Sequence, residues 1–260
     1  MKNSWIIKKI GDAGKLKDAV LIEGMPGIGN VGKIAIDFIV ENKKAKKIYD
    51  LFSYDLPNSV FIKENNLVEL PKIEIYHFKQ KNCDILLLGG DVQPMIERSC
   101  YEFCDAVLDI CEELGCKKVI TTGGIGLNKV PSKPRVYCTA NNKAILKDIK
   151  SKSPKVKDRA YGTVGPLVGV SGVLLGLAEM RKIAGAALLA ETLAHPMYLG
   201  MAGARNILEV LDDYLDLKLS LKNIDKEIKE IEEEVIKKTH ELQQAMKTNE
   251  KKAEKQNYIV

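Results

Sequence analysis

Short apolar runs alternate with segments of helical period over residues 1–216. The clearest apolar run, Asp84–Leu88, ends in two glycines, and the segment after it, Ile96–Leu114, places apolar residues at helical spacing. A continuous apolar run of this length is typical of a strand that is buried on both faces of a parallel sheet. The two segments together predict one strand–helix unit.

The same pattern predicts the remaining elements. We expect strands at Ser4–Ile10, Asp18–Glu23, Ile48–Tyr54, Ser59–Lys63, Ile73–Phe78, Lys118–Thr122, Pro134–Thr139 and Ala184–Ala190, and helices at Lys33–Val40 and Met201–Leu215. Pro57 and Pro71 interrupt the strands between residues 48 and 78, which favours an antiparallel or edge region there. The alternation predicts a three-layer α/β/α fold around a mostly parallel sheet, with right-handed crossovers.

The pattern changes after about residue 216, where glycine and proline disappear and charged residues become dense. Apolar residues then recur at steps of three and four, interrupted at Lys238, and this spacing is a heptad seam. The seam consists of Leu221, Ile224, Ile228, Ile231, Val235 and Leu242. Such a seam favours a coiled coil between copies of the chain over a solvated helix packed on its own domain. We therefore expect a homo-oligomer.

This change divides the chain into three parts. We expect an α/β globular domain over residues 1–216 and a helical, coiled-coil-like extension over residues 217–247. A flexible tail over residues 248–260 is polar except for its apolar tip, which is Tyr258, Ile259 and Val260.

Three glycine clusters stand out within the α/β part: Gly24–Lys33, Thr121–Gly126 and the loop that begins Tyr161–Met180. The first two follow apolar runs, and in the third Pro166 suits the first turn of a helix. Loops that leave the carboxyl ends of parallel strands meet at one edge of a sheet. We therefore expect the three clusters to lie together there.

The first cluster has two alternative interpretations. Gly27, Gly29 and Gly32 spell the dinucleotide pattern GxGxxG, and with Lys33 the segment nearly spells a phosphate loop. However, Ile34 stands where a phosphate loop needs a magnesium-binding Ser or Thr. The hypothesis favoured here is a tight strand-to-helix turn that serves packing, with nucleotide binding as the alternative.

The second cluster has the same two interpretations. Thr122, Gly123 and Gly124 could offer hydroxyl and amide donors to an anion at a glycine-rich turn. A structural turn is the favoured interpretation here as well.

Only one pair of residues suggests acid–base chemistry. Glu191 and His195 are four residues apart beside an expected strand, but no nucleophile in the sequence completes the pair. His77 lies within an expected strand and is interpreted as structural. We expect no catalytic residues and no enzyme activity.

Composition excludes several classes of protein. The 40 basic and 35 acidic residues are mixed along the chain, which argues against a nucleic-acid-binding protein. The apolar run at residues 164–178 is short and broken by glycines, so we expect no membrane span. The first eleven residues lack the continuous apolar segment of a signal peptide, so we expect none.

The six cysteines contain no CxxC pair and indicate a reducing, cytoplasmic location. Cys100, Cys104 and Cys111 share one helical face, where buried thiols are favoured over a metal cluster. We therefore expect no metal and no cofactor.

The glycine clusters also carry a resemblance to a known family. The segments Ile22–Ala35, Thr121–Gly126 and Tyr161–Leu175 resemble the proteasome assembly chaperone 2 family in its archaeal form. The resemblance covers about residues 20–217. It implies a three-layer fold like that of nucleoside phosphorylases and hydrolases, without an established catalytic set.

The same resemblance implies a partner, which is the proteasome core particle with its ring of α subunits. Some members of the family end in a hydrophobic residue, Tyr and any residue, and this tail inserts between α subunits. Here Tyr258 is third from the end, and Ile259 and Val260 keep the tip apolar.

Two functional hypotheses follow from the sequence. The first is a non-enzymatic chaperone or adaptor whose tails dock on the proteasome core. The second is a phosphorylase-like enzyme or nucleotide-binding protein that uses the loops Gly24–Lys33 and Thr121–Gly126.

Overall fold

A sheet of eight strands lies at the centre of the first of the two units into which the chain divides, residues 1–219 and 220–260. The computed structural model describes residues 4–157, 159–162, 164–222, 224–226 and 228. In sheet order the strands are β1 (Trp5–Lys9), β3 (Lys46–Ser53), β6 (Ile73–Lys79), β7 (Asp84–Gly90), β2 (Val20–Gly24), β8 (Lys118–Leu127), β10 (Ala184–Leu193) and β9 (Val136–Ala140).

The four central strands, β7, β2, β8 and β10, run parallel to one another. In β7 the four side chains from Ile85 to Leu88 are fully buried. Parallel strands that are covered by helices on both faces need apolar side chains in both directions, which explains why these strands read as continuous apolar runs. The α/β fold predicted from the sequence is confirmed.

Antiparallel strands extend the sheet on both sides, so the sheet as a whole is mixed. On one side β6 pairs with β7, β3 with β6 and β1 with β3, and on the other side β9 pairs with β10. The predicted antiparallel region is confirmed for β3 and β6. The strand predicted at Ser59–Lys63 is shorter than expected and does not belong to the eight-stranded sheet. It is β4 (Phe61–Ile62), which pairs with β5 (Val68–Glu69) in a separate two-stranded hairpin.

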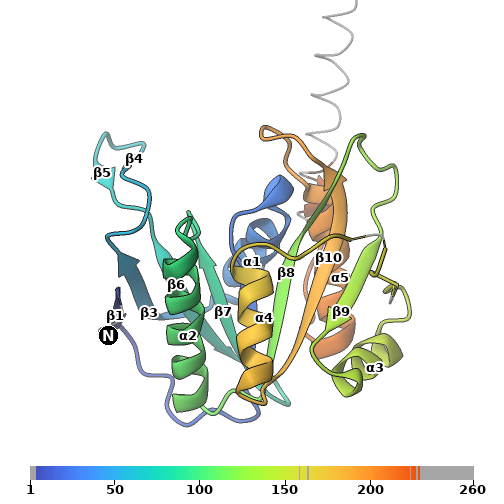
Figure 1. Ribbon diagram of the computed structural model, residues 1–260, viewed down its shortest axis with the longest axis horizontal. Helices are drawn as coiled ribbons and strands as arrows, with labels where there is room; N and C mark the ends of the chain where they lie inside the picture. The colour runs from blue at the N-terminus through green and yellow to red at the C-terminus, as the bar shows by residue number, and fades with distance from the viewer. Residues whose placement is uncertain (1–3, 158, 163, 223, 227, 229–260) are drawn as a thin grey trace, which may run out of the picture. The chain divides into compact units, whose positions relative to one another are not determined.

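Helices cover both faces of the sheet (Figure 1). On the near face α2 (Glu97–Glu113) packs against α4 (Val170–Met180), and on the far face α1 (Val31–Lys43) packs against α5 (Met201–Leu215). A short helix, α3 (Lys143–Lys152), contacts β9 and β10. This arrangement is the three-layer α/β/α architecture.

The inward face of α2 carries the three cysteines that share one helical face. Cys100, Cys104 and Cys111 are buried beside Phe103 in the main hydrophobic core. Their predicted role as small apolar residues is confirmed. Among the described residues, no group of three or more His, Cys, Asp and Glu side chains is placed to hold a metal ion.

Two local predictions are wrong. The segment Thr121–Gly126 is not a turn, because β8 continues through it to Leu127, paired throughout with β10. The backbone pairing with β10 stabilises this strand although glycine has a low intrinsic propensity for strands. Pro166 does not begin a helix, because α4 begins at Val170 after Gly169, whose φ of 83° is favourable only for glycine.

The predicted seam lies in the second unit, and only part of it is described. The backbone of Ile224 and Ile228 is helical, and the amide of Asp225 donates to the carbonyl of Leu221. Ile231, Val235 and Leu242, and the tip Tyr258, Ile259 and Val260, lie outside the described residues. None of the described helices combines the length and the apolar character needed to cross a membrane.

Candidate functional site

The three glycine clusters meet at the edge of the sheet where the parallel strands end. The hydroxyl of Thr122 in β8 donates to the carbonyl oxygen of Glu23 in β2 at 2.8 Å. The hydroxyl of Ser171, in the first turn of α4, donates to the carboxylate of Glu23 at 2.8 Å. The convergence predicted from the sequence is therefore confirmed.

The glycines at this edge bring backbone segments into direct contact. A Cβ atom added to Gly124 would lie 2.2 Å from the carbonyl oxygen of Ile28, and one added to Gly32 would lie 2.5 Å from the carbonyl oxygen of Thr122. Real Cβ atoms do not approach a carbonyl so closely. Gly32 and Gly124 therefore serve close packing between segments of the same chain, which favours the packing interpretation for these two positions.

The polar groups of the turn between β2 and α1 are bound by other groups of the same chain. Gly29, in the 3₁₀ turn η1 (Ile28–Asn30), has a φ of 63°, and its carbonyl accepts the amide of Gly200 at 2.7 Å. The ammonium of Lys33 lies 2.9 Å from Asp37 and 3.8 Å from Asp91. The lysine that a phosphate loop would direct at its ligand is thus paired with carboxylates of the same chain.

The carboxyl group of Glu23 is the main ionisable group buried at this edge. Its side chain is fully buried and accepts the amide of Met25 at 2.8 Å in addition to the hydroxyl of Ser171. Burial raises the pKa of Glu23 to about 7, and these hydrogen bonds oppose the rise. Glu23 is therefore largely protonated below neutral pH and can then act as a hydrogen-bond donor.

The side chain of Gln93 joins the first and third glycine clusters. Its amide nitrogen donates to the carbonyl of Pro26 at 2.8 Å, and its amide oxygen accepts the amide of Val170 at 3.4 Å. Gln93 follows β7, so a residue from a third loop holds the other two in place. The edge is a hydrogen-bonded assembly of loops.

The possible acid–base pair is not brought together. Glu191 is buried in β10 and accepts hydrogen bonds from the Nε and the backbone amide of Arg135, at 2.8 and 2.9 Å. The hydrogen bonds from Arg135 hold the pKa of Glu191 below its ordinary value. His195 is exposed, and its Nδ1 accepts the amide of Met197 at 3.2 Å.

His77 has a structural contact. Its Nε2 lies 2.8 Å from the Oδ1 of Asp84, and the pair joins β6 to the adjacent β7. This is the position that the sequence predicted for it, within a strand.

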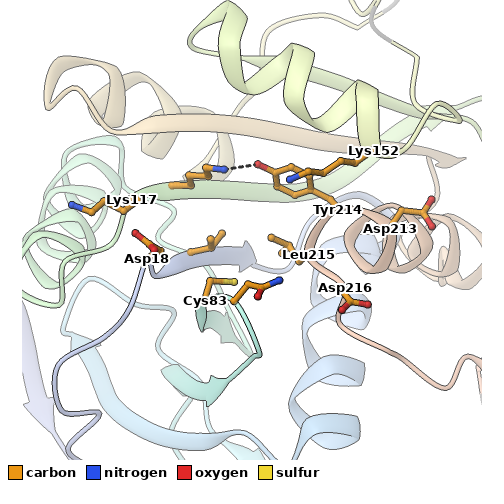
Figure 2. Close-up of a pocket in the computed structure, with 11 residues that line it drawn as sticks. Asp18, Cys83, Lys117, Lys152, Asp213, Tyr214, Leu215 and Asp216 are labelled. Atoms are coloured by element: carbon orange, nitrogen blue, oxygen red, sulfur yellow. Dashed lines mark hydrogen bonds between the residues drawn. The ribbon is translucent and has the colours of Figure 1, made fainter.

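A pocket of about 540 Å³ lies at the opposite edge of the sheet, where the parallel strands begin (Figure 2). Its lining includes Val20 at the start of β2, Lys118 at the start of β8, and Tyr214 near the end of α5. Lys117 and Lys152 contribute positive charge, and Asp18, Asp213 and Asp216 contribute negative charge.

Tyr214 lines this pocket and contacts two lysines. The ammonium of Lys118 donates to its hydroxyl at 3.0 Å, and the ammonium of Lys152 lies 4.8 Å from its ring centre. The same hydroxyl donates to Asp148 at 2.9 Å. Burial, together with the bond to Asp148, raises the pKa of Tyr214 above its ordinary value. Lys118, Tyr214 and Asp148 therefore satisfy one another beside the pocket.

Sequence reasoning missed both Glu23 and the pocket. A signal for Glu23 was present, because a lone acidic residue stands at the end of an otherwise apolar buried strand, VLIEG. The pocket had no such signal. Lys118, Lys152 and Tyr214 come from three elements and are brought together only by the folded chain.

The sequence is similar to a known protein family and to a protein of another organism. A model of the PAC2 family matches residues 21–239. An uncharacterized protein of Methanocaldococcus jannaschii, MJ1210, is 31% identical over 239 residues, which cover 91% of this chain and 90% of the relative.

Solved structures show the same fold. The crystal structure of Pyrococcus furiosus PbaB, described as an archaeal proteasome activator, has a TM-score of 0.84 and 30% identity, over 92% of this chain and all of that one. Pyrococcus furiosus PbaA, described as an archaeal homolog of proteasome-assembly chaperone, has a TM-score of 0.75 and 24% identity, over 97% of this chain and 99% of that one.

Proposed function

The chain belongs to the PAC2 family, and we propose that it is a non-enzymatic chaperone or adaptor that binds the proteasome core particle at its ring of α subunits. The observation that carries this proposal is the likeness to PbaB, an archaeal proteasome activator, which extends over 92% of this chain at 30% identity. A cytoplasmic location follows from this partner.

The geometry at the glycine-rich edge supports a binding protein over an enzyme. Gly32 and Gly124 are in backbone contact with neighbouring segments, and Lys33 is paired with Asp37. Glu191 is held by Arg135, away from any acid–base role with His195. We therefore do not propose the phosphorylase-like or nucleotide-binding alternative.

Within this proposal the three parts of the chain have different tasks. Residues 1–216 form the folded body, residues 217–247 associate copies through the heptad seam, and residues 248–260 carry the apolar tip to the partner. The tip, Tyr258, Ile259 and Val260, would bury its apolar side chains in a groove between α subunits. An oligomer gains affinity because it presents several tips at once.

Deletion of residues 258–260 tests the role of the tip. The full chain and the truncated chain are compared in a pull-down with an archaeal proteasome core particle, and their melting temperatures are measured as a control for folding. We expect the truncated chain to melt at the same temperature and to lose at least tenfold in affinity. Binding that is as tight as that of the full chain would show that the folded body, and not the tip, makes the contact.

A further inference from the structure

The pocket at the edge where the parallel strands begin is large enough for a small organic molecule. Its volume is about 540 Å³, and pockets that bind small molecules typically measure about 300–1,000 Å³. Val20, at the start of β2, and Leu215, the last residue of α5, give its lining an apolar part. All the lining residues belong to the unit of residues 1–219, so one folded body forms the whole pocket.

The carboxylates of the lining are either paired elsewhere or solvated. Asp213 forms an ion pair at 3.5 Å with Lys155, which is not part of the lining. Asp18 and Asp216 are exposed, as is Lys117, and exposed charges are screened by water. These four lining residues therefore leave the charge beside Tyr214 to be balanced by its own neighbours.

Two ammonium groups beside Tyr214 share a single carboxylate. Asp148 lies 3.3 Å from the ammonium of Lys118 and 3.4 Å from that of Lys152. Both contacts are longer than the roughly 2.7–2.9 Å of a strong hydrogen bond between an ammonium and a carboxylate. One negative charge is thus divided between two positive ones. The group carries an excess positive charge.

The two lysines also have hydrogen-bond donors to spare. An ammonium group has three N–H donors, and Lys118 uses two of them, toward Asp148 and the hydroxyl of Tyr214. Lys152 donates no hydrogen bond to any residue that the structure describes, and its ammonium lies 4.8 Å from the ring centre of Tyr214 (Figure 2). Excess charge and spare donors therefore occur at the same place in the pocket.

We propose that the pocket binds a small organic anion. Its carboxylate or phosphate group lies between the ammonium groups of Lys118 and Lys152, and its apolar part lies against Val20 and Leu215. The anion supplies the missing negative charge and accepts the spare N–H donors. Lysine binds both kinds of anionic group as a point charge, so the shared chemistry is the anionic oxygen. A neutral molecule of the same shape would leave the positive charge uncompensated.

This site differs from the one in the proposed function. It involves neither the tip of the chain nor the glycine-rich edge, because its residues lie where the parallel strands begin. The proposal therefore holds or fails independently of binding to the proteasome core particle.

Alkylation of Cys83 reports whether the pocket is occupied. Cys83 lines the pocket and is half-buried, whereas the other five cysteines are buried. The full chain is treated with iodoacetamide in the presence of millimolar phenyl phosphate, benzoate or benzyl alcohol, and the Cys83 peptide is followed by mass spectrometry. We expect at least one of the two anions to slow the reaction about threefold or more, as occupancy at twice the dissociation constant requires. Benzyl alcohol has the same ring without a charge and should leave the rate unchanged.

The outcomes of this experiment are decisive in both directions. Protection by phenyl phosphate alone, or by benzoate alone, supports the site and identifies the anionic group that it prefers. Protection by neither anion overturns the proposal, and so does equal protection by benzyl alcohol, because the pocket would then recognise the ring and not the charge.

A lysine substitution tests the same site without relying on the reactivity of Cys83. Lys152→Met removes one of the two ammonium groups, and the matched control, Lys147→Met, removes an exposed one from the same helix outside the lining. Saturation-transfer NMR follows the ring signals of phenyl phosphate and of benzoate with each protein, and melting temperatures check folding. We expect the signal of the bound anion to fall markedly for Lys152→Met and to persist for Lys147→Met. Equal signals from both variants and the wild type would contradict the assignment.

Discussion

At the scale of the residue, the glycines at the carboxyl edge of the sheet differ in whether a single added Cβ atom would have space. Their positions were evident from the sequence, and so was their convergence at one edge. The sequence did not show which of them are in contact with backbone, because Ile28 and Gly124 are far apart in the chain. Gly27 and Gly124 belong to similar glycine-rich segments, yet a Cβ atom has open space at Gly27 and none at Gly124.

This contrast predicts opposite outcomes for two similar substitutions. Gly124→Ala places a methyl group against the carbonyl of Ile28, and such overpacking typically costs about 1–3 kcal/mol of unfolding free energy. Gly27→Ala meets no neighbour within 4 Å and should change stability by less than about 0.5 kcal/mol. Urea unfolding of both variants checks this. Equal stability of the two would contradict the close contact at Gly124.

A second prediction at this scale concerns the buried carboxyl group of Glu23. Burial raises its pKa from 4.5 to about 7, so the folded state binds more protons than the unfolded state between these values. Its contribution to stability is therefore full below pH 4.5, falls as the pH rises, and is lost above about pH 7. One pKa unit corresponds to about 1.4 kcal/mol, so the total loss is about 3 kcal/mol.

Glu23→Gln is the matched variant for this prediction. Glutamine stays neutral, and it can accept the amide of Met25 and donate to Ser171 as the protonated acid does. The unfolding free energies of the variant and the wild type are measured in urea from pH 5 to pH 8. We expect the value for the variant minus the value for the wild type to increase as the pH rises. A constant difference between the two proteins would mean that Glu23 does not titrate in this range.

At the scale of elements, the sequence predicted the parallel strands and the helices most reliably. The apolar run Asp84–Leu88 corresponds to β7, and the periodic segment Ile96–Leu114 corresponds to α2. A strand that is buried on both faces is a continuous apolar run, and a helix that is buried along one stripe has apolar residues at helical spacing, so both are recognisable in the sequence. The pattern was less informative where long-range pairing decides the structure. β8 extends through a glycine cluster because β10 pairs with it, and no local property of the cluster indicates that partner.

The heptad seam is an element that can be tested by substitution. Each buried Ile contributes roughly 1.5–3 kcal/mol, so Ile228→Asp with Ile231→Asp should weaken the association between copies. We expect a lower mass in light scattering than for the wild type. The control, Lys222→Asp with Lys229→Asp, changes charge at positions outside the seam and should keep the wild-type mass. A double Ile variant with unchanged mass and helix content would exclude the seam as an interface.

At the scale of the whole molecule, the family was evident from the sequence, and the pocket at the edge where the parallel strands begin was not. Three motifs in order resembled the family that the comparisons then identified over residues 21–239. The pocket around Tyr214 could not be predicted, because Lys118 and Lys152 reach it from different elements.

Binding of the full chain to the proteasome core particle tests the central claim most directly. In sedimentation velocity, fluorescently labelled chain is mixed with increasing amounts of unlabelled archaeal core particle, and the signal of the label alone is followed. The account predicts that the label moves into the fast boundary of the core particle and saturates as the core particle increases. If the label sediments at the rate of the free chain at every concentration of core particle, the chain does not bind it and the proposed function is wrong.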